Sequence, residues 1–402
     1  MMLVSAPWVL PICSPPIRDG AVLVKGTRIA RVGTIAELAA AHPTAERRHF
    51  EGCTILPGLV NAHTHLAMTS LQGVAGPGDF ATWISRIPAA WGALSASEIR
   101  ESIERGMRMS LASGVTVVGD ISYGPDSPAI GSQLGIGGVF FEEVLGIPAE
   151  ELPARLREMC FPAPHADARI RQGLTPHAPY TAGPGLIAAA HSAAASAGAP
   201  FAIHVAESAA ESELLASGTG PLAAVAARVA VGFEAPGASA VRYLDALGVL
   251  DDALAIHCVK VDAADATLLA AKTRGVVVCP RSNAYLGNGA PPVELLLEHG
   301  VTLGLGTDSL ASNADLDLFE EARALANLLP TLAAEKIIAI MTVGGAKALG
   351  VEGDFGTLEP GKQADLAIFG VLSEDPHAAL LAEASARTLS ALLAAGEWRP
   401  SA

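Results

Sequence analysis

The chain has few cysteines and few basic residues, and each shortage excludes a class of protein. Its five cysteines are scattered, odd in number and free of any Cys-x-x-Cys pair. A disulfide framework and a structural zinc knuckle are therefore not expected, and a reducing cytoplasm fits best. The 26 lysines and arginines are outnumbered by 41 aspartates and glutamates, a formal net charge of −15. This charge argues against nucleic acid or an anionic membrane surface as a partner.

Long apolar runs are also missing. The longest weakly polar stretch, residues 186–206, is mostly Ala, Ser and Gly and contains Pro200 and two histidines, so we expect no membrane span. The opening "MMLVSAPWVLPICSPP" has no basic segment and is broken by prolines. We read it as a strand and not as an export signal. With half of its residues hydrophobic and 17% charged, the chain has the composition of a well-cored globular protein.

Short β-rich runs alternate with helix-like runs through the middle of the chain. Eight such strands, from "TILPGLVNAH" to "VTLGLGTDS", are separated by segments rich in Ala, Leu, Glu and Arg. This pattern is typical of parallel βα units. A doubly wound open sheet would carry a Gly-rich phosphate turn after its first strand, where this chain has "NAHTHL". Residues 54–310 have the length of a (β/α)8 TIM barrel, about 250 residues, so we predict an α/β fold of this type.

The two ends of the chain differ from the middle. The segments "GAVLVKGTRIARVG" and "GDFGTLEPGKQADLAIFG" are short strands joined by glycine-containing turns. We predict that residues 1–53 and 311–402 together form a small β-sandwich domain with packing helices. Its C-terminal strands would begin near residue 353.

Titratable side chains gather at the predicted carboxyl ends of the strands, where a TIM barrel places its catalytic groups. Residues two apart in a strand point to the same face, so His63 and His65 would aim at one point. Taken alone, this pair could equally be two polar residues of a surface loop. Further titratable or polar residues at strand ends are Asp120, Glu142, Glu143, His177, His204, Glu207, His257, Arg281, Ser282, Asn283 and Asp308.

Imidazoles and a carboxylate that converge from different strands suit a divalent transition ion. Zinc prefers nitrogen and oxygen ligands and keeps one position open for water in catalytic sites. Iron or manganese accept similar ligands, so the sequence leaves the metal open. The fourth strand ends in His177 and not in a lysine that could be carbamylated. We therefore expect one metal ion and not two.

These motifs resemble the amidohydrolase superfamily, and most closely its one-metal branch of nucleobase and aminotriazine deaminases and chlorohydrolases. The resemblance lies in His-x-His, in the histidines of "HVAE" and "IHC", in the aspartate of "GTDS" and in "GTLEPGKQADLAIF", and so covers nearly the whole chain. It implies one divalent ion, with Zn2+ as the first choice, bound by the ligands His63, His65, His204 and Asp308. It also implies supporting roles for Glu207 and His257.

Elementary chemistry gives these three groups distinct tasks. Asp308 can ligate the metal and accept a proton from the attacking water. His257 can hydrogen-bond the reacting oxygen. Glu207 lies too far after His204 to share its direction in a regular strand, so we expect it on the following loop, facing the substrate ring. There it can protonate a ring nitrogen, a contribution of about 10²–10⁴ in rate.

Four more residues are candidates for substrate binding, and each has a structural alternative. His177 could donate a hydrogen bond to the substrate or pack within a Pro-rich turn. Trp83 could stack on the substrate base or belong to the core. Arg281 could hold a substrate carboxylate with two hydrogen bonds or form a salt bridge within its loop. Glu143 could likewise bind the substrate or have a structural role.

The resemblance implies a metal-dependent hydrolytic deaminase of an aminopurine or a nucleoside-like derivative. The stretches "VGDIS", "FFEEVLG", "RYLDALGVL" and "CPRSNAYL" are similar to aminodeoxyfutalosine deaminases of menaquinone biosynthesis. Those enzymes convert 6-amino-6-deoxyfutalosine, which carries a benzoate, to futalosine and ammonia.

Several alternatives stay open. They are a deaminase of S-adenosylhomocysteine or 5′-deoxyadenosine type, an aminotriazine chlorohydrolase, and a non-catalytic scaffold. The small zinc deaminase fold is excluded, because its His-x-Glu and Pro-Cys-x-x-Cys signature is absent. The expected partner is a small purine-containing molecule, with no nucleic acid and no membrane, and a homo-oligomer is left open.

Overall fold

A closed barrel forms the larger part of the molecule. The computed structural model describes residues 1–74, 76–162 and 165–399, and within them lie two four-stranded parallel sheets, β6-β7-β8-β9 and β10-β11-β12-β13. Parallel bridges from Leu174 to Phe201 and from Thr64 to Asp308 join the two sheets at both edges. The predicted (β/α)8 barrel is therefore confirmed. Its strands are β6 (Leu59–Thr64), β7 (Val115–Ser122), β8 (Gly137–Glu143), β9 (Ile170–Thr175), β10 (Ala202–Val205), β11 (Leu254–His257), β12 (Gly275–Val278) and β13 (Leu303–Leu305).

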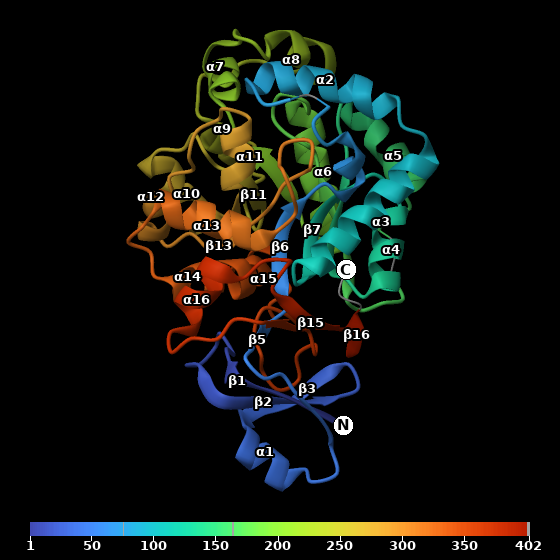
Figure 1. The fold of residues 1–402 in the computed structure, drawn as a ribbon. Helices are drawn as coiled ribbons and strands as arrows, with labels where there is room; N and C mark the ends of the chain where they lie inside the picture. The colour runs from blue at the N-terminus through green and yellow to red at the C-terminus, as the bar shows by residue number, and fades with distance from the viewer. Residues whose placement is uncertain (75, 163–164, 400–402) are drawn as a thin grey trace.

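Helices follow the barrel strands and surround them (Figure 1). Two of these helices begin at a capping box, in which side chains satisfy backbone N–H groups of the first turn. The capping box of α3 is formed by Ser95 and Glu98, and that of α10 by Asp262 and Asp265. The helices are η1 (Leu66–Leu71), α2 (Phe80–Gly92), α3 (Ala96–Ala112), α4 (Asp126–Leu134), η2 (Ala149–Glu151), α5 (Leu152–Glu158), α6 (Pro184–Ala197), α7 (Ala209–Ser217), α8 (Ala223–Val229), α9 (Ala240–Ala246), α10 (Ala263–Lys272), α11 (Pro280–Tyr285), α12 (Val293–Glu298), α13 (Leu318–Leu328), α14 (Ala334–Ala339), η3 (Ile340–Gly344) and α15 (Gly345–Leu349).

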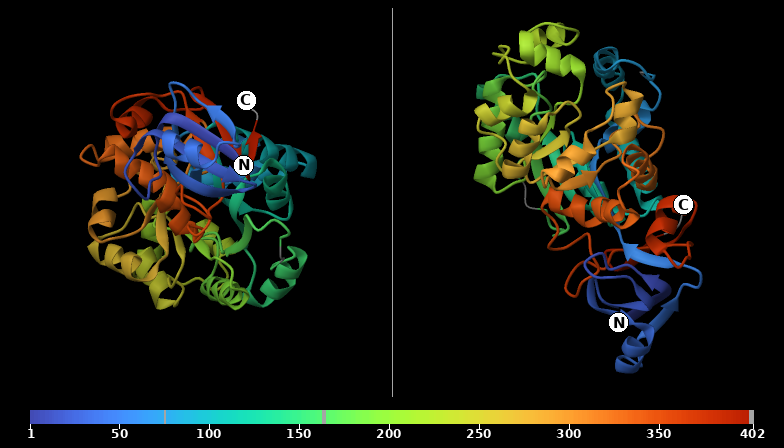
Figure 2. Two further views of the ribbon diagram at one scale, coloured as in Figure 1. Left: turned by 90° about the horizontal axis from the view of Figure 1, so that it is seen from below. Right: turned by 90° about the vertical axis from the view of Figure 1, so that its left-hand side faces the viewer.

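Both ends of the chain meet in a satellite sheet below the barrel, as Figures 1 and 2 show. Its strand order is β16-β15-β14-β5-β1-β2-β3, with β4 paired to β1. The prediction that the two termini share one β-rich unit is confirmed. The elements of this part are β1 (Met2–Val9), β2 (Ile17–Lys25), β3 (Arg28–Thr34), α1 (Ile35–Ala41), β4 (Glu46–His49), β5 (Thr54–Pro57), β14 (Leu366–Phe369), α16 (Pro376–Glu383), β15 (Leu389–Ala394) and β16 (Glu397–Arg399).

The first strand-like run of the sequence is divided between the two units. Residues 54–57 pair with β1 and β14 in the satellite sheet, and the barrel begins at Leu59. Gly58 lies between them, and a Cβ at this position would come within 2.1 Å of Oγ1 of Thr116. Only glycine allows the chain to pass this close to β7. The barrel thus starts a few residues later than the predicted boundary at residue 54.

The barrel end next to the satellite sheet is filled by apolar side chains. Ala346 and Leu349 of α15 pack in one cluster with Val60, Val139 and Ile256 of the barrel strands. Because this end is filled, the carboxyl ends of the strands form the accessible end of the barrel.

A buried ion pair joins the barrel to the satellite sheet. The guanidinium of Arg169, just before β9, donates to both carboxylate oxygens of Asp365, just before β14, at 2.9 and 2.8 Å. Both side chains are buried. None of the helices in the described ranges combines the length and the apolar character needed to cross a bilayer.

Candidate metal centre and active site

Four histidines and one aspartate meet at the carboxyl ends of the barrel strands. His63 and His204 lie near the ends of β6 and β10, and His257 ends β11, whereas His65 directly follows β6 and Asp308 lies in the loop after β13. The Nε2 atoms of His63 and His65 each lie 3.6 Å from Oδ1 of Asp308. Donor atoms of His63, His204 and His257 also lie within 4.8 Å of one another. The structure thus brings the four predicted ligands together, with His257 beside them.

This donor set fits a divalent transition ion. Ligand atoms at zinc distances around a tetrahedral centre are about 3.3–3.6 Å apart, which matches the observed separations from Asp308. Both ring nitrogens of His63 are buried without a hydrogen-bond partner, a costly arrangement that a metal ion would relieve. Nδ1 of His204 lies 2.9 Å from the carbonyl oxygen of His177. A proton on Nδ1 would donate to that carbonyl and leave Nε2 free to ligate.

The backbone at these positions is strained. His177, Ala206, His257 and Asp308 all have positive φ angles, of 30°, 53°, 78° and 57°. Such angles are uncommon outside glycine and cluster at functional sites. Local hydrogen bonding supports the same region, since the carboxylate of Asp120 accepts the N–H of Leu66 at 2.8 Å, next to His65.

The electrostatics favour the protonation states that metal ligands require. Burial alone would raise the pKa of Asp308, but the imidazoles around it, first His63 at 3.6 Å and then His65 and His257, hold that pKa well below its usual range. Burial lowers the pKa of His257 to about 3, and burial with the neighbouring imidazoles lowers the pKa values of His65 and His204. The aspartate is therefore ionised and these three imidazoles are neutral near pH 7.

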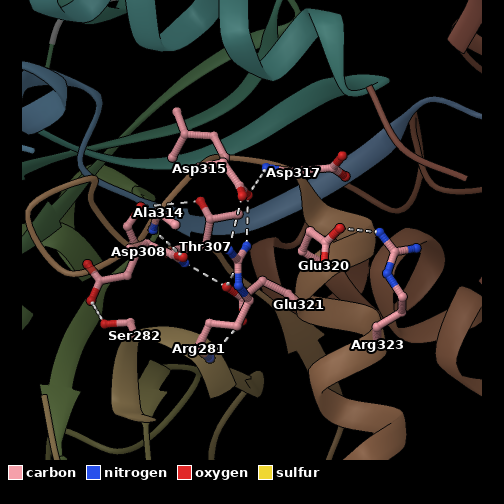
Figure 3. Close-up of polar contacts among 12 residues, drawn as sticks. Arg281, Ser282, Thr307, Asp308, Ala314, Asp315, Asp317, Glu320, Glu321 and Arg323 are labelled. Atoms are coloured by element: carbon pink, nitrogen blue, oxygen red, sulfur yellow. Dashed lines mark hydrogen bonds and ion pairs between the residues drawn. The ribbon is translucent and has the colours of Figure 1, made fainter. Parts of the chain in front are cut away.

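Hydroxyl groups fix the orientation of the Asp308 carboxylate. Ser282 donates to Oδ2 at 2.6 Å, a contact drawn in Figure 3, and Ser312 donates to the same oxygen at 3.1 Å. The backbone N–H of Ser309 donates to Oδ1 at 2.7 Å. Oδ2 is thus held by two hydroxyls, and Oδ1 is the oxygen that faces His63 and His65.

Glu207 is a buried carboxyl group on the cavity wall. Its Oε1 accepts a hydrogen bond from Nδ2 of Asn288 at 3.2 Å and lies 3.7 Å from Nε2 of His257. Its backbone N–H donates to the carboxylate of Glu211 at 2.7 Å. Burial, then the charges of Asp308 and Glu211, raises the pKa of Glu207 well above its usual range. This shift favours the protonated form that a general acid needs.

A cavity of about 560 Å³ extends outward from these residues, and three predicted substrate-binding residues line it. Nδ1 of His177 lies 2.5 Å from Oγ1 of Thr181. The indole N–H of Trp83 donates to the carbonyl oxygen of Ala311 at 2.9 Å, so only its ring faces are left for a ligand. Burial raises the pKa of Glu143 to about 8, and its Oε1 has no hydrogen-bond partner.

Arg281 does not reach this cavity, which corrects its expected role. It lies in the first turn of α11, and its guanidinium donates to both carboxylate oxygens of Asp315 at 2.7 and 3.0 Å, as Figure 3 shows. It also lies 3.9 Å from Glu321 of α13, which accepts the backbone N–H of Arg281. With its charge paired to these two carboxylates, Arg281 forms the loop salt bridge and is not placed to bind a substrate carboxylate.

Several residues that line the cavity were missed in the sequence. Tyr123 directly follows β7, so the rule that found the other strand-end residues would also have found it. Trp91, Arg155 and Arg228 lie on α2, α5 and α8. No local pattern marks these three, because only the position of each helix in the fold brings them to the cavity.

The architecture and the site agree with a known family. The model described as "Amidohydrolase family" matches residues 54–399. The chain belongs to the amidohydrolase family. A second model, described as an imidazolonepropionase-like composite domain of bacteria, matches residues 20–45 of the satellite sheet. Membership confirms the predicted superfamily.

Individual relatives of the family are similar over most of their length. A 5-methylthioadenosine/S-adenosylhomocysteine deaminase of Pelotomaculum thermopropionicum is 33% identical, with 87% of this chain and 79% of that protein covered. The structure of an adenosine deaminase from Xanthomonas campestris with bound zinc is 28% identical, with a TM-score of 0.84 and 99% and 92% covered. The Helicobacter pylori aminofutalosine deaminase shares the fold, with a TM-score of 0.87, 24% identity and 100% of each chain covered. This amidohydrolase is thus a hydrolase that acts on carbon–nitrogen bonds.

Proposed function

We propose that this amidohydrolase is a metal-dependent hydrolytic deaminase of a 6-aminopurine nucleoside. The observation that carries the proposal is the group of His63, His65, His204 and Asp308 next to a cavity on whose wall the buried carboxyl group of Glu207 lies. The pKa of Asp308 lies below its usual range and that of Glu207 lies above it. These opposite shifts are in keeping with a base and an acid in one reaction.

The residues present fit a single metal ion. His63, His65, His204 and Asp308 would hold it, with zinc as the first choice. A divalent ion bound there would lower the pKa of a coordinated water from that of bulk water to about 7, which would make a nucleophile available at neutral pH.

Side chains of the protein carry out the proton transfers, and each has a separate role. Asp308 accepts a proton through its carboxylate, whose orientation Ser282 and Ser312 maintain. Glu207 donates its proton to a purine ring nitrogen as the carbon that bears the amino group is attacked. His257, whose Nε2 lies 3.7 Å from the carboxyl of Glu207, hydrogen-bonds the new oxygen. In total, an amine and water give a carbonyl compound and ammonia.

Two substrates are candidates within this class. The first is 6-amino-6-deoxyfutalosine, which would be converted to futalosine and ammonia in menaquinone biosynthesis. The fold match to the aminofutalosine deaminase over its whole length supports this choice. The second is 5-methylthioadenosine or S-adenosylhomocysteine, supported by the 33% identity to the Pelotomaculum deaminase. Both carry an adenine ring and differ in the group attached at the 5′ position.

An ammonia-release screen of the purified zinc-loaded enzyme tests the proposal. The compounds are aminodeoxyfutalosine, S-adenosylhomocysteine, methylthioadenosine, 5′-deoxyadenosine, adenosine and an aminotriazine, each with a metal-depleted sample as the control. We expect release from at least one nucleoside and none from the metal-depleted enzyme. Release from the aminotriazine alone, or from no compound, would refute the proposed function.

A further inference from the structure

Two arginines lie at the outer part of the cavity. Arg155 of α5 and Arg228 of α8 both line it, and both are exposed, whereas the residues around the metal site are buried. Both helices lie on the part of the barrel away from the satellite sheet (Figure 1). Among the described lining residues, they are the only lysine or arginine side chains. The mouth of the cavity is therefore cationic.

The guanidinium groups are available to a ligand. Arg228 forms no hydrogen bond or ion pair with another described residue. Arg155 forms one ion pair, with Glu158 at 3.2 Å within the same helix, and both side chains of this pair are largely exposed. Exposed pairs of this kind contribute little, so Arg155 can turn to a better partner at small cost.

No acid neutralises this mouth within the lining. The carboxyl groups that line the cavity are Glu143, Glu207 and Asp308, and all three are buried near the imidazoles. The whole chain has a net charge of −15 and would repel an anion at long range. Two arginines in the lining nevertheless offer an anionic group local cationic partners in a chain that is acidic overall.

Several parts of the cavity wall are apolar. They include Ile147 from the loop after β8, Val229 from α8, and Trp91, whose ring centroid lies 4.7 Å from that of Tyr123. Such walls favour an apolar or aromatic spacer between the nucleoside and its charged end.

We propose that Arg228, assisted by Arg155, binds a carboxylate at the end of the substrate's 5′ substituent. This inference rests on the proposed deaminase function and specifies its substrate class as an adenosine derivative with an apolar spacer and a terminal carboxylate. A planar guanidinium matches a carboxylate with two parallel hydrogen bonds. The described lining offers no acid for an ammonium group at this end, so an aryl acid fits better than a zwitterionic amino acid. The geometry thus favours aminodeoxyfutalosine over S-adenosylhomocysteine and methylthioadenosine.

A matched pair of substrates tests the assignment. The first is an adenosine derivative with a 5′-linked benzoate, and the second is the corresponding benzamide, which has the same shape and no charge. The measured quantity is the ratio of kcat/KM for the acid to kcat/KM for the amide. In the wild type this ratio should exceed one and fall as salt is added, because exposed charges are screened.

Three variants separate the arginines from the helices that carry them. We expect Arg228→Met to lower the ratio about 10-fold, as for the loss of a charge-assisted hydrogen bond, and Arg155→Met to lower it less. Arg157→Met is the matched control, because Arg157 is also exposed on α5 but does not line the cavity. It should keep the wild-type ratio. If Arg228→Met does not fold, Arg228→Lys keeps the charge without the planar fork and should give an intermediate ratio.

The outcomes distinguish this inference from the proposed function. A wild-type ratio near one, or an unchanged ratio in both Arg228→Met and Arg155→Met, would overturn the carboxylate subsite while leaving the deaminase intact. Equal losses on acid and amide would mean that Arg228 supports the cavity wall, and would also overturn it. If neither substrate releases ammonia in the wild type and the wider screen also fails, the deaminase proposal itself is wrong.

Discussion

Replacing Glu207 with glutamine separates proton donation from every other property of the site. The amide has nearly the same shape as the carboxyl group, and its carbonyl oxygen can still accept the hydrogen bond that Asn288 donates at 3.2 Å. Glu207 is not among the four predicted metal ligands. The substitution therefore removes one titratable proton and leaves the donor set of His63, His204 and their partners intact.

The substitution is expected to lower the rate of turnover but not the stability of the folded enzyme. A positioned general acid contributes about 10²–10⁴ in rate, which is about 3–5 kcal/mol of the activation barrier. The pKa of Glu207 is raised well above its usual value in the folded state. A carboxyl group with a raised pKa makes the folded protein less stable as the pH rises above the pKa that the group has in the unfolded chain. The reason is that the group ionises more easily in the unfolded chain. The neutral amide has no such loss, so the melting temperature near pH 7 should not fall.

The assay combines three measurements on one preparation. They are steady-state ammonia release, metal content per chain and the thermal unfolding midpoint, for the wild type and for Glu207→Gln. Glu213→Gln serves as the control, because Glu213 is exposed on the neighbouring helix α7 and does not line the cavity. We expect kcat to fall at least about 100-fold with full metal content. A kcat within about threefold of the wild type at full metal content would show that another group supplies the proton.

Three further predictions concern the metal, the contact between barrel and sheet, and pH. His63→Ala should lose bound metal and turnover together, as measured by metal analysis, and full turnover in a metal-free sample would contradict the mechanism. Arg169→Met leaves the carboxylate of Asp365 buried without its ion-pair partner. Denaturant titration should therefore show a loss of about 3–5 kcal/mol in the free energy of unfolding. A loss below about 1 kcal/mol would mean that the pair is solvated. Burial raises the pKa of Glu321 from 4.5 to about 8 in the folded chain. Between these pH values the unfolded chain binds fewer protons than the folded chain, so stability falls as the pH rises. The melting temperature of Glu321→Gln should therefore decline less steeply from pH 5 to pH 9 than that of the wild type. Parallel curves of melting temperature against pH for the two proteins would refute the assignment.

The sequence alone determined the class of fold and predicted which histidines and which aspartate would lie together. Alternating βα runs predict parallel strands, and in a barrel the carboxyl ends of parallel strands converge. This rule is why His63, His65, His204, His257 and Asp308 could be grouped although they are scattered along the chain, and the structure places them around one point. Such residues are predictable because their positions follow from local periodicity and a topology shared by all barrels.

Only the tertiary structure decided where the remaining side chains point. Arg281 follows a strand as Asp308 does, yet it begins a helix and pairs with Asp315 and Glu321 across the adjoining loop. Arg155 and Arg228 carry no motif, and they line the cavity only because of where the fold places α5 and α8. The physical reason is that strand periodicity is a local property, whereas the direction of a loop or a short helix depends on long-range packing and on which charges lie within reach. The raised pKa of Glu207 has largely the same origin, since it comes first from burial and then from the charge of Asp308, which is distant in the sequence, with Glu211 nearby.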